Sequence, residues 1–323
     1  MKRIGVLTSG GDGPGFNPSV RAVVRMACSQ GIQVTGIRRG YAGLLDHEFV
    51  ELTDRSVSGI MGKGGTILGT ARSLEFTSRR GQLEALRNLN EAEIEGLVVI
   101  GGDGTMRGGQ RLHELGFPVV GVPGTIDNDL SGTDMSIGVD TALNTALDAI
   151  DRIKDTASSH QRAFLVQVMG RNSGYLALMT GIAGGAEMVC VPEVPFELDD
   201  VERTVTQAYI KGKSHCIIVV AEGARFDAPQ IAEYLDARRE EGGFSVRVTI
   251  LGHIQRGGSP SAFDRILATR LGAAATQALI EGRRGEMVGL VGNTIVFTPF
   301  THVISEPKPI DVQMFQLAGV LAK

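Results

Sequence analysis

Short apolar runs alternate with amphipathic segments along the whole chain. The apolar runs are rich in β-branched residues, and their lengths predict strands at 4–8, 34–37, 97–100, 119–122, 164–168, 188–191, 216–221, 246–251 and 294–298. Within these runs the apolar residues are mostly consecutive, which is typical of strands buried on both faces. The pattern therefore favours parallel sheets covered on both sides.

The segments between the runs carry a helical period. Apolar residues in 141–156 recur every three to four positions, as on the buried face of an amphipathic helix. Further helices are expected at 17–30, 199–211 and 259–280, with Asn17, Asp199 and Ser259 as their N-caps. Strands separated by helices predict an α/β fold.

The length of 323 residues suggests two domains. Residues 7–15 predict a strand, a glycine-rich turn and a helix start, and residues 168–174 repeat this order. We therefore expect two similar Rossmann-like three-layer domains with mainly parallel sheets, which face one cleft. The helix at 141–156 is the expected crossing point between them.

Composition narrows the functional classes. A formal net charge of −4 argues against general nucleic-acid binding, and no apolar run approaches the roughly 20 residues that span a bilayer. Cys28, Cys190 and Cys216 lie far apart without a CxxC pair, which favours structural thiols over a disulfide framework or a zinc site. The chain enters a strand directly without a signal-peptide pattern, so a cytoplasmic location is expected.

Three strand-to-loop junctions carry the candidate chemistry. The strand at 4–8 leads into the glycine-rich loop 9–15, the strand at 97–100 into Gly-Gly-Asp-Gly-Thr at 101–105, and the strand at 119–122 into Pro-Gly-Thr-Ile-Asp-Asn-Asp at 123–129. Bare glycines let backbone N–H groups approach a phosphate, and a following helix N-terminus adds partial positive charge. Ligands of open α/β sheets bind at the carboxyl ends of strands, so these loops can share a crevice.

The carboxylates in these loops suit phosphoryl transfer. Asp103 is the one carboxylate of its loop, and magnesium needs few carboxylates beside water and phosphate oxygens. Asp127 and Asp129 lie two residues apart, so one can accept a hydroxyl proton while the other supports the metal or the loop. Taken alone, the loop that carries Asp103 also fits a structural turn with an Asp helix cap, and the loop that carries Asp127 and Asp129 fits a solvated acidic turn.

Arginine side chains also lie in or beside predicted strands and glycine turns. Arg72 comes after a glycine turn, Arg162 opens a strand, Arg171 lies in a glycine turn at a strand end, and Arg247 lies in a strand. That strand leads into Gly-His-Ile-Gln-Arg-Gly-Gly at 252–258, before a predicted helix. Backbone amides, a helix dipole and two side-chain donors there fit a phosphate monoester.

Four motifs together resemble the ATP-dependent 6-phosphofructokinase family of bacterial type, and the resemblance covers nearly the whole chain. They are residues 123–129, Ser-Ser-His-Gln-Arg at 158–162, Met-Gly-Arg at 169–171 and residues 252–258. The resemblance implies Mg-ATP as co-substrate, fructose 6-phosphate as acceptor, and transfer to its 1-hydroxyl.

The resemblance also implies residue roles. Asp127 would be the general base, Asp103 the Mg²⁺ ligand with Asp129 in support, and Gly11, Arg72, Arg171 and Thr125 would serve the transferring phosphoryl group. The ATP site would comprise Gly11, Arg72, Ser73, Gly102, Asp103, Gly104 and Thr105. The fructose 6-phosphate site would comprise Thr125, Ile126, Asp127, Arg162, Met169, Gly170, Arg171, Glu222, Arg247, His253, Ile254, Gln255 and Arg256.

The family pattern further implies a homotetramer in which neighbouring subunits share sites through positions such as Arg162 and Arg247. The ATP-binding domain would comprise 1–138 and about 252–305, and the fructose 6-phosphate-binding domain 139–251 and about 306–323. An effector site between subunits would use Arg21, Arg25, Lys154, Gly185, Glu187, Lys211, Lys213 and His215. Asp54 and Lys154 replace arginines common in the family, so weak or altered allosteric control is expected.

Two positions bear on the phosphoryl donor. Pyrophosphate-using relatives usually carry Asp and Lys where this chain has Gly104 and Gly124, and small residues leave room for a nucleotide. ATP is therefore expected as donor, whereas Ser73 and Thr77 leave the choice between ATP and GTP open. The alternatives are a pyrophosphate-dependent or other sugar-phosphate kinase of this fold, and a catalytically silent sensor.

Overall fold

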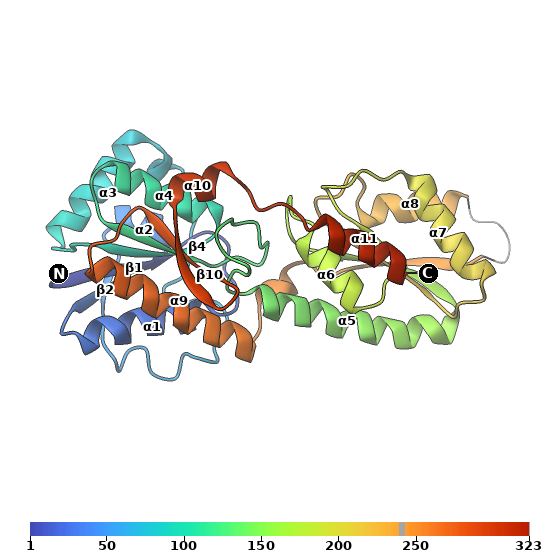
Figure 1. Ribbon diagram of the computed structural model, residues 1–323, viewed down its shortest axis with the longest axis horizontal. Helices are drawn as coiled ribbons and strands as arrows, with labels where there is room; N and C mark the ends of the chain where they lie inside the picture. The colour runs from blue at the N-terminus through green and yellow to red at the C-terminus, as the bar shows by residue number, and fades with distance from the viewer. Residues whose placement is uncertain (239–242, 323) are drawn as a thin grey trace. The chain divides into compact units, whose positions relative to one another are not determined.

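The computed structural model describes residues 1–238 and 243–322 (Figure 1). The chain forms two compact units. Unit 1 comprises Met1–Thr141 and Arg256–Lys308, and unit 2 comprises Ala142–Gln255 and Pro309–Lys323. Each unit contains a mainly parallel β-sheet with helices, which confirms the predicted α/β class.

Unit 1 is built on a seven-stranded sheet in the order β11-β10-β5-β4-β1-β2-β3. The pairs β2–β3 and β10–β11 are antiparallel, and the other pairs are parallel. Its strands are β1 (Arg3–Thr8), β2 (Gln33–Ile37), β3 (Phe49–Leu52), β4 (Leu97–Gly101), β5 (Val119–Pro123), β10 (Glu286–Val291) and β11 (Thr294–Pro299). Its helices are α1 (Phe16–Ser29), α2 (Gly40–Leu45), α3 (Arg79–Glu91), α4 (Asp103–Glu114), α9 (Ala262–Ile280), α10 (Phe300–Ser305) and the 3₁₀ turn η1 (Glu75–Thr77).

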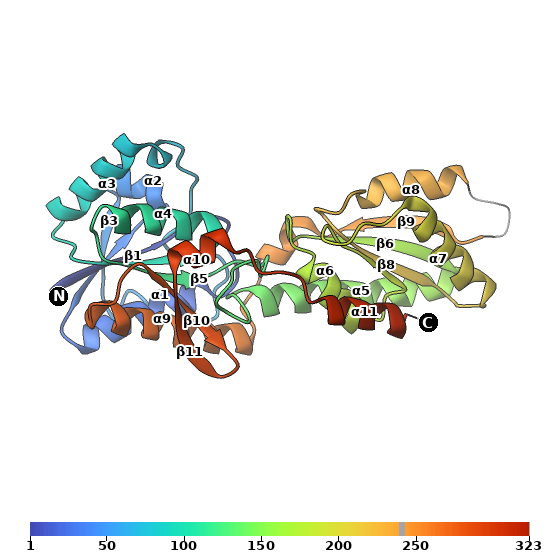
Figure 2. The ribbon, with the colours of Figure 1, turned by 45° about the horizontal axis from the view of Figure 1, so that its top comes forward.

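Helices cover both faces of this sheet (Figures 1 and 2). Val98 and Ile100 of β4 pack with residues of α1 and α9, whereas Leu97 and Val99 pack on the other face with residues of α2, α3, α4 and α10. Because neighbouring side chains of a strand point to opposite faces, a strand covered on both sides needs apolar residues at every position. This explains the continuous apolar runs of the sequence.

Unit 2 is built on a four-stranded parallel sheet in the order β7-β8-β6-β9. Its strands are β6 (Arg162–Val168), β7 (Met188–Cys190), β8 (Cys216–Ala221) and β9 (Ser245–Ile250). Its helices are α6 (Tyr175–Ala183), α7 (Leu198–Ile210), α8 (Ala228–Ala237), α11 (Val312–Leu321) and the start of the 3₁₀ turn η2 (Gly252–Arg256). Residues of α7 and α8 pack on one face of this sheet, and α6 contacts β6, β7 and β8.

The chain passes from unit 1 to unit 2 within α5 (Val139–His160), which contains the helix predicted at 141–156. Each of the three predicted N-caps is wrong by two residues. The caps are Gly15 for α1, Glu197 for α7 and Ser261 for α9. Asn17 instead bonds the loop of Lys63–Ile67 through its side chain, and a capping box with Asp200 favours Glu197 over Asp199.

Two strands of unit 1 were not expected from the sequence. Strand β3 is short and lies at the sheet edge, and β10 contains Gly289 in its interior. A Cβ at Gly289 would lie 1.9 Å from the carbonyl oxygen of Gly132, so the close approach of two backbones requires glycine there. Among the described residues, no helix is long and apolar enough to cross a membrane.

Candidate active site

Three loops meet at one edge of the sheet of unit 1. Strands β5, β4 and β1 are consecutive neighbours and run parallel, so the loops that follow Thr8, Gly101 and Pro123 leave the same edge. The expectation that the three junctions lie at carboxyl ends of strands is confirmed, and the structure adds that the three strands are neighbours. In such sheets this edge is where ligands bind.

Hydrogen bonds join the first two loops at the ends of β1 and β4. The Thr105 hydroxyl donates to the Ser9 carbonyl at 3.0 Å, and the Ser9 N–H donates to the Ile100 carbonyl at 3.0 Å. A Cβ at Gly101 would lie 2.2 Å from Oγ1 of Thr105, so only glycine allows this contact. The Gly124 N–H donates to the Gly101 carbonyl at 2.9 Å and thereby adds the third loop.

Asp103 is the first residue of α4, and Gly102 is its N-cap without a side-chain hydrogen bond. The unpaired amides of a helix start and its positive dipole end favour an anion at this position. Oδ2 of Asp103 accepts from Nε of Arg107 at 2.9 Å, in a solvent-exposed pair one turn apart. Within the described chain the other carboxylate oxygen accepts no hydrogen bond. A partly exposed carboxylate oxygen beside a phosphate-binding helix start fits a magnesium ligand.

Asp127 lies in the third loop and is only 4% exposed. Its N–H donates to Oγ1 of Thr125 at 3.1 Å, which closes a tight turn. Asn128 follows with a positive φ of 51°, and its side chain donates to the Asp134 carbonyl and accepts from the Ser136 N–H. The returning segment 134–136 therefore fixes the loop that carries the candidate base.

A cavity of about 500 Å³ lies beside these loops in unit 1. It is lined by Ser9, Gly10, Tyr41, Ala71, Arg72, Ser73, Leu74, Phe76, Thr77, Gln82, Gly104, Thr105, Arg107, Gly108, Gln110, Arg111 and Ile304. This volume is in the range of small-ligand sites. Arg72, Ser73, Gly104 and Thr105, all predicted for ATP binding, share this cavity.

Tyr41 and Phe76 form a wall of this cavity that sequence reasoning missed. Their rings stack with centroids 4.2 Å apart, and the Tyr41 hydroxyl donates to the Thr105 carbonyl at 2.7 Å. Burial raises the pKa of Tyr41 well above its usual value, so its hydroxyl stays protonated. Tyr41 lies between Gly40 and Gly43, and Phe76 has no glycine beside it, but neither aromatic follows directly on a predicted strand as the glycine-rich loops do.

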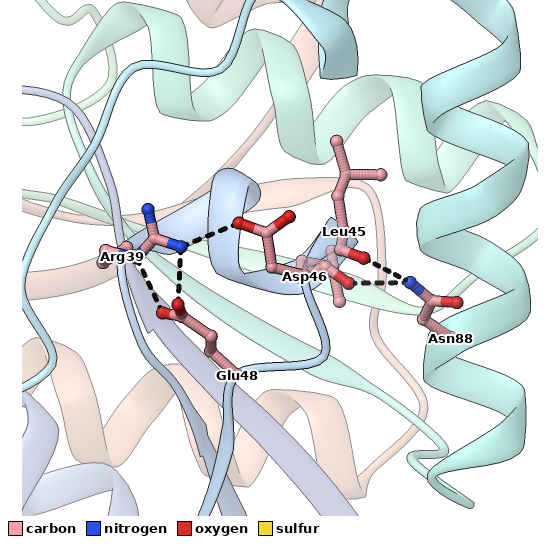
Figure 3. Close-up of polar contacts among 6 residues, drawn as sticks. Arg39, Leu45, Asp46, Glu48 and Asn88 are labelled. Atoms are coloured by element: carbon pink, nitrogen blue, oxygen red, sulfur yellow. Dashed lines mark hydrogen bonds and ion pairs between the residues drawn. The ribbon is translucent and has the colours of Figure 1, made fainter.

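A polar cluster holds the short helix α2, which carries Tyr41 (Figure 3). Arg39 has a positive φ of 55°, and its guanidinium donates to Asp46 at 2.7 Å and to Oε2 of Glu48 at 2.7 Å. The amide of Asn88 donates to the carbonyls of Leu44 and Leu45, which end the helix. Satisfying these terminal carbonyls stabilises a helix that is too short to persist alone.

Two arginines approach the phosphate loops from different segments. The Thr8 hydroxyl bonds Thr66 and donates to the Gly69 carbonyl, both at 2.9 Å, which ties the segment before Arg72 to the end of β1. Nη1 of Arg256 donates to the Asp12 carbonyl at 3.2 Å. The structure thus brings Arg256 to the first glycine-rich loop.

In unit 2, the turn after β6 is held by two buried or half-buried acceptors. Oε1 of Gln255 accepts from the Met169 N–H at 2.8 Å, and Oε1 of Glu222 accepts from the Arg171 N–H at 2.7 Å and the Gly170 N–H at 3.3 Å. Glu222 and Gln255 therefore shape the backbone of Met169–Arg171. Arg171 adopts a positive φ of 50° and is exposed.

Strands β6 and β9 bring two further predicted arginines together in unit 2. Arg162 lies opposite Ser245, so Arg247 lies two positions further along the neighbouring strand. Arg247, His253 and Ile254 are exposed, and Arg162 is half-buried.

The residues predicted for an effector site divide between the units. In unit 2, Nζ of Lys213 lies 3.2 Å from Oε1 of Glu187, and His215 bonds Ser158 through Nδ1 at 2.9 Å. A Cβ at Gly185 would lie 3.9 Å from Nζ of Lys154. Arg21 and Arg25 belong to α1 of unit 1, and Lys211 follows α7 of unit 2.

A larger cavity of about 790 Å³ lies at the opposite edge of the unit 1 sheet. Lys2, Arg3 and Gln33 line it, and these residues precede or begin β1 and β2. It therefore lies at the amino ends of the strands, away from the glycine-rich loops. Ligands of this fold class bind at the carboxyl ends, so we assign the site to the smaller cavity and its loops.

Comparison with known proteins agrees with this geometry. The family model described as Phosphofructokinase matches residues 3–279. The chain is 55% identical over 323 residues to "ATP-dependent 6-phosphofructokinase 1" of Thermus thermophilus and 51% identical over 323 residues to "ATP-dependent 6-phosphofructokinase" of Thermotoga neapolitana, with 100% of each chain covered in both cases. Among solved structures, phosphofructokinase from Saccharomyces cerevisiae superposes with a TM-score of 0.86 at 38% identity, covering 94% of this chain and 45% of that chain. This chain belongs to the phosphofructokinase family.

Proposed function

We propose that this protein is an ATP-dependent 6-phosphofructokinase that converts fructose 6-phosphate and Mg-ATP into fructose 1,6-bisphosphate and ADP, the committed step of glycolysis. The observation that carries the proposal is the meeting of two glycine-rich loops and the Asp127 loop at one sheet edge, beside a cavity of about 500 Å³. The full-length relatives named for this activity support the same substrates. A cytoplasmic enzyme fits this role.

Asp127 is the proposed general base. Its carboxylate takes the proton of the sugar 1-hydroxyl as the hydroxyl oxygen bonds to the γ-phosphorus, and the bond between that phosphorus and the β–γ bridging oxygen breaks to release ADP. The turn through Thr125 and the bonds of Asn128 hold this carboxylate in place. Positioning and charge neutralisation carry most of the catalysis in such transfers.

Unit 1 is the proposed ATP-binding domain. The cavity walls of Tyr41 and Phe76 would receive the nucleoside, and the amides of the loops at Gly11 and Gly102–Thr105 would receive the phosphates. Asp103 would hold Mg²⁺, whose charge would offset that of the phosphate oxygens. Arg72 and Arg171 would neutralise charge on the transferring group.

Unit 2 is the proposed fructose 6-phosphate-binding domain. The Met169–Arg171 turn, with Ile126 and Thr125 of unit 1, would contact the sugar, and Arg162, Arg247, His253 and Arg256 would bind the 6-phosphate. We further propose a homotetramer with shared sites. Its effector site would respond weakly, because Asp54 places a carboxylate where the family has a cation and Lys154 lacks a bidentate fork.

The test is the product formed from fructose 6-phosphate, ATP and Mg²⁺, detected by aldolase cleavage, with wild-type protein and Asp127→Ser. We expect turnover by the wild type and a loss of about 10²- to 10⁴-fold in kcat in the variant. Equilibrium dialysis should show that the variant still binds fructose 6-phosphate. Wild-type protein that binds both substrates without turnover would make it a sensor instead.

A further inference from the structure

The buried carboxylate of Asp264 has no role in the mechanism above. Asp264 lies in the first turn of α9 and is 0% exposed. Its Oδ1 accepts from the Gly138 N–H at 2.9 Å, and its Oδ2 accepts from the Thr141 N–H at 2.8 Å and the Thr141 hydroxyl at 2.6 Å. Burying a carboxylate is costly, so the three bonds must offset its desolvation.

The starts of α5 and α9 cap each other at this point. Oγ of Ser261 accepts from the Asp264 N–H at 3.2 Å and donates to Oδ2 of Asp140 at 2.6 Å. The Ser261 N–H donates to Oγ1 of Thr141 at 2.9 Å. Two helix starts are therefore locked together by side chains of both.

The bond to Gly138 reaches outside the helix. Helix α5 begins at Val139, so a plain helix cap would need only the Thr141 amide. Gly138 instead has a positive φ of 103° and ends the segment that runs beside the catalytic loop. One oxygen of Asp264 is therefore committed to that segment.

The same segment braces the Asp127 loop. The Ile137 N–H donates to the Pro123 carbonyl at 3.0 Å, and the Thr125 N–H donates to the Ile137 carbonyl at 3.1 Å. This adds a strand-like pairing of Ile137 with Gly124 at the end of β5. Oγ1 of Thr125 in turn accepts from the Asp127 N–H, so hydrogen bonds joined by the peptide bond between Ile137 and Gly138 lead from Asp264 to the catalytic loop.

Ile137 and Gly138 also lie against the first glycine-rich loop. A Cβ at Gly15 would lie 2.5 Å from Cγ2 of Ile137 and 3.7 Å from Cβ of Asp264, and a Cβ at Gly138 would lie 3.2 Å from the Pro14 carbonyl. Any shift of 137–138 therefore moves against two loops of the site at once.

We propose that Asp264 is a positioning residue for phosphoryl transfer, which sets the Asp127 loop through Gly138 and Ile137. This rests on the proposed kinase function. Asp264→Asn replaces one oxygen by an amide group that faces an N–H, so either Gly138 or Thr141 loses its acceptor. A shift of about 1 Å in the catalytic loop is expected to reduce kcat by about 10- to 100-fold, while KM for both substrates changes by less than about twofold.

The experiment measures kcat and both KM values for wild type and Asp264→Asn, at a temperature at which circular dichroism shows both folded. Because Asp264→Asn can fail to fold, Thr141→Val and Thr276→Val form a second, matched pair. Each removes one hydroxyl from a buried threonine; Thr141 bonds Asp264, whereas Thr276 bonds the Gly272 carbonyl within α9. Thr141→Val should lower kcat by about threefold, and Thr276→Val should leave kcat unchanged. The Thr141 hydroxyl also accepts from the Ser261 N–H, so Thr141→Val should lose more stability than Thr276→Val.

Loss of kcat in Asp264→Asn, or in Thr141→Val alone of the threonine pair, supports the proposal. A folded Asp264→Asn protein with wild-type kcat overturns it and leaves Asp264 as a helix cap. If Asp264→Asn does not fold, equal kcat in both threonine variants overturns it. A wild-type protein without turnover overturns both this proposal and the kinase function. If the wild type is active and the variants show no effect on kcat, only the proposed role of Asp264 is overturned.

Discussion

The guanidinium of Arg256 lies against the backbone of Gly11. A Cβ at Gly11 would lie 2.1 Å from Nη1 of Arg256, and the same nitrogen donates to the Asp12 carbonyl at 3.2 Å. The sequence motif around Arg256 suggested a sugar-phosphate ligand, and the structure also places this cation at the loop proposed for the transferring phosphoryl group. Glycine at position 11 is what permits that approach.

Gly11→Ala should therefore displace Arg256 or the loop and lower kcat by about 100-fold with little loss of stability. The control is Gly62→Ala, because a Cβ there would make only an ordinary contact of 3.6 Å with Arg265. Steady-state kinetics and thermal unfolding of both variants check this. Wild-type kinetics in Gly11→Ala would show that the contact with Arg256 carries no function.

Gly104→Ala is expected to raise the stability of the protein and to weaken nucleotide binding. Nothing lies within 4 Å of a Cβ at Gly104, which is the second residue of α4 and lines the nucleotide cavity. Alanine should stabilise the helix by about 0.5–1 kcal/mol while its methyl group takes room from ATP. We predict a higher Tm together with a raised KM for ATP and an unchanged KM for fructose 6-phosphate. An unchanged KM for ATP would show that the bound nucleotide does not contact Gly104.

The pair of Arg107 with Asp103 should compete with the metal. Arg107→Met releases Oδ2 of Asp103, and an exposed ion pair is worth at most about 1 kcal/mol, so the Mg²⁺ concentration for half-maximal rate should fall by up to about fivefold. Arg87→Met is the matched control, because it breaks another exposed i,i+4 pair, with Glu91 on α3. Mn²⁺ binding followed by electron paramagnetic resonance gives a second readout. Weaker metal binding in Arg107→Met would contradict the competition.

The three thiols should differ in reactivity. Burial raises the pKa of Cys190 to about 12 and raises the pKa of Cys216 further, with Glu187 adding to the latter. Burial and nearby Asp54 also raise the pKa of Cys28, but its side chain is only half-buried. Since the thiolate forms only as pH rises toward the pKa, native protein at pH 8 should react slowly with Ellman's reagent, at one thiol per chain. Cys28→Ser should abolish that reaction. Unfolding of the wild-type protein should make all three thiols reactive. Rapid reaction of two or more thiols in the native protein would contradict the prediction.

Much of the scaffold could be predicted from the sequence because buried parallel strands need apolar residues at every position. The runs in β4, β5 and β8 follow this rule, and α5 shows instead the helical period of an amphipathic helix. Strand β3 carries no such run because it lies at an antiparallel edge and is only partly buried, and the run of β10 is interrupted by Gly289. The observed N-caps differ from the predicted ones because several residues near each helix start can serve as the cap.

The site was predictable where its chemistry is local. Glycine-rich loops, Asp103 and Asp127 lie in continuous motifs at strand ends. Tyr41 and Asp264 depend instead on contacts between segments distant in sequence. Pairwise distances of this kind are set by tertiary packing, so no single motif reveals them.

The kinase function is tested by measuring phosphoryl transfer to fructose 6-phosphate with Mg²⁺, with ATP and pyrophosphate compared in parallel as donors. We predict turnover with ATP and none comparable with pyrophosphate, because Gly104 lines the cavity proposed for the nucleotide and nothing lies within 4 Å of a Cβ there. Gly124 does not face that cavity, because a Cβ there would lie 2.7 Å from the ring of Phe16. Comparable turnover with pyrophosphate would contradict the donor assignment, and inactivity with both donors would contradict the proposed reaction.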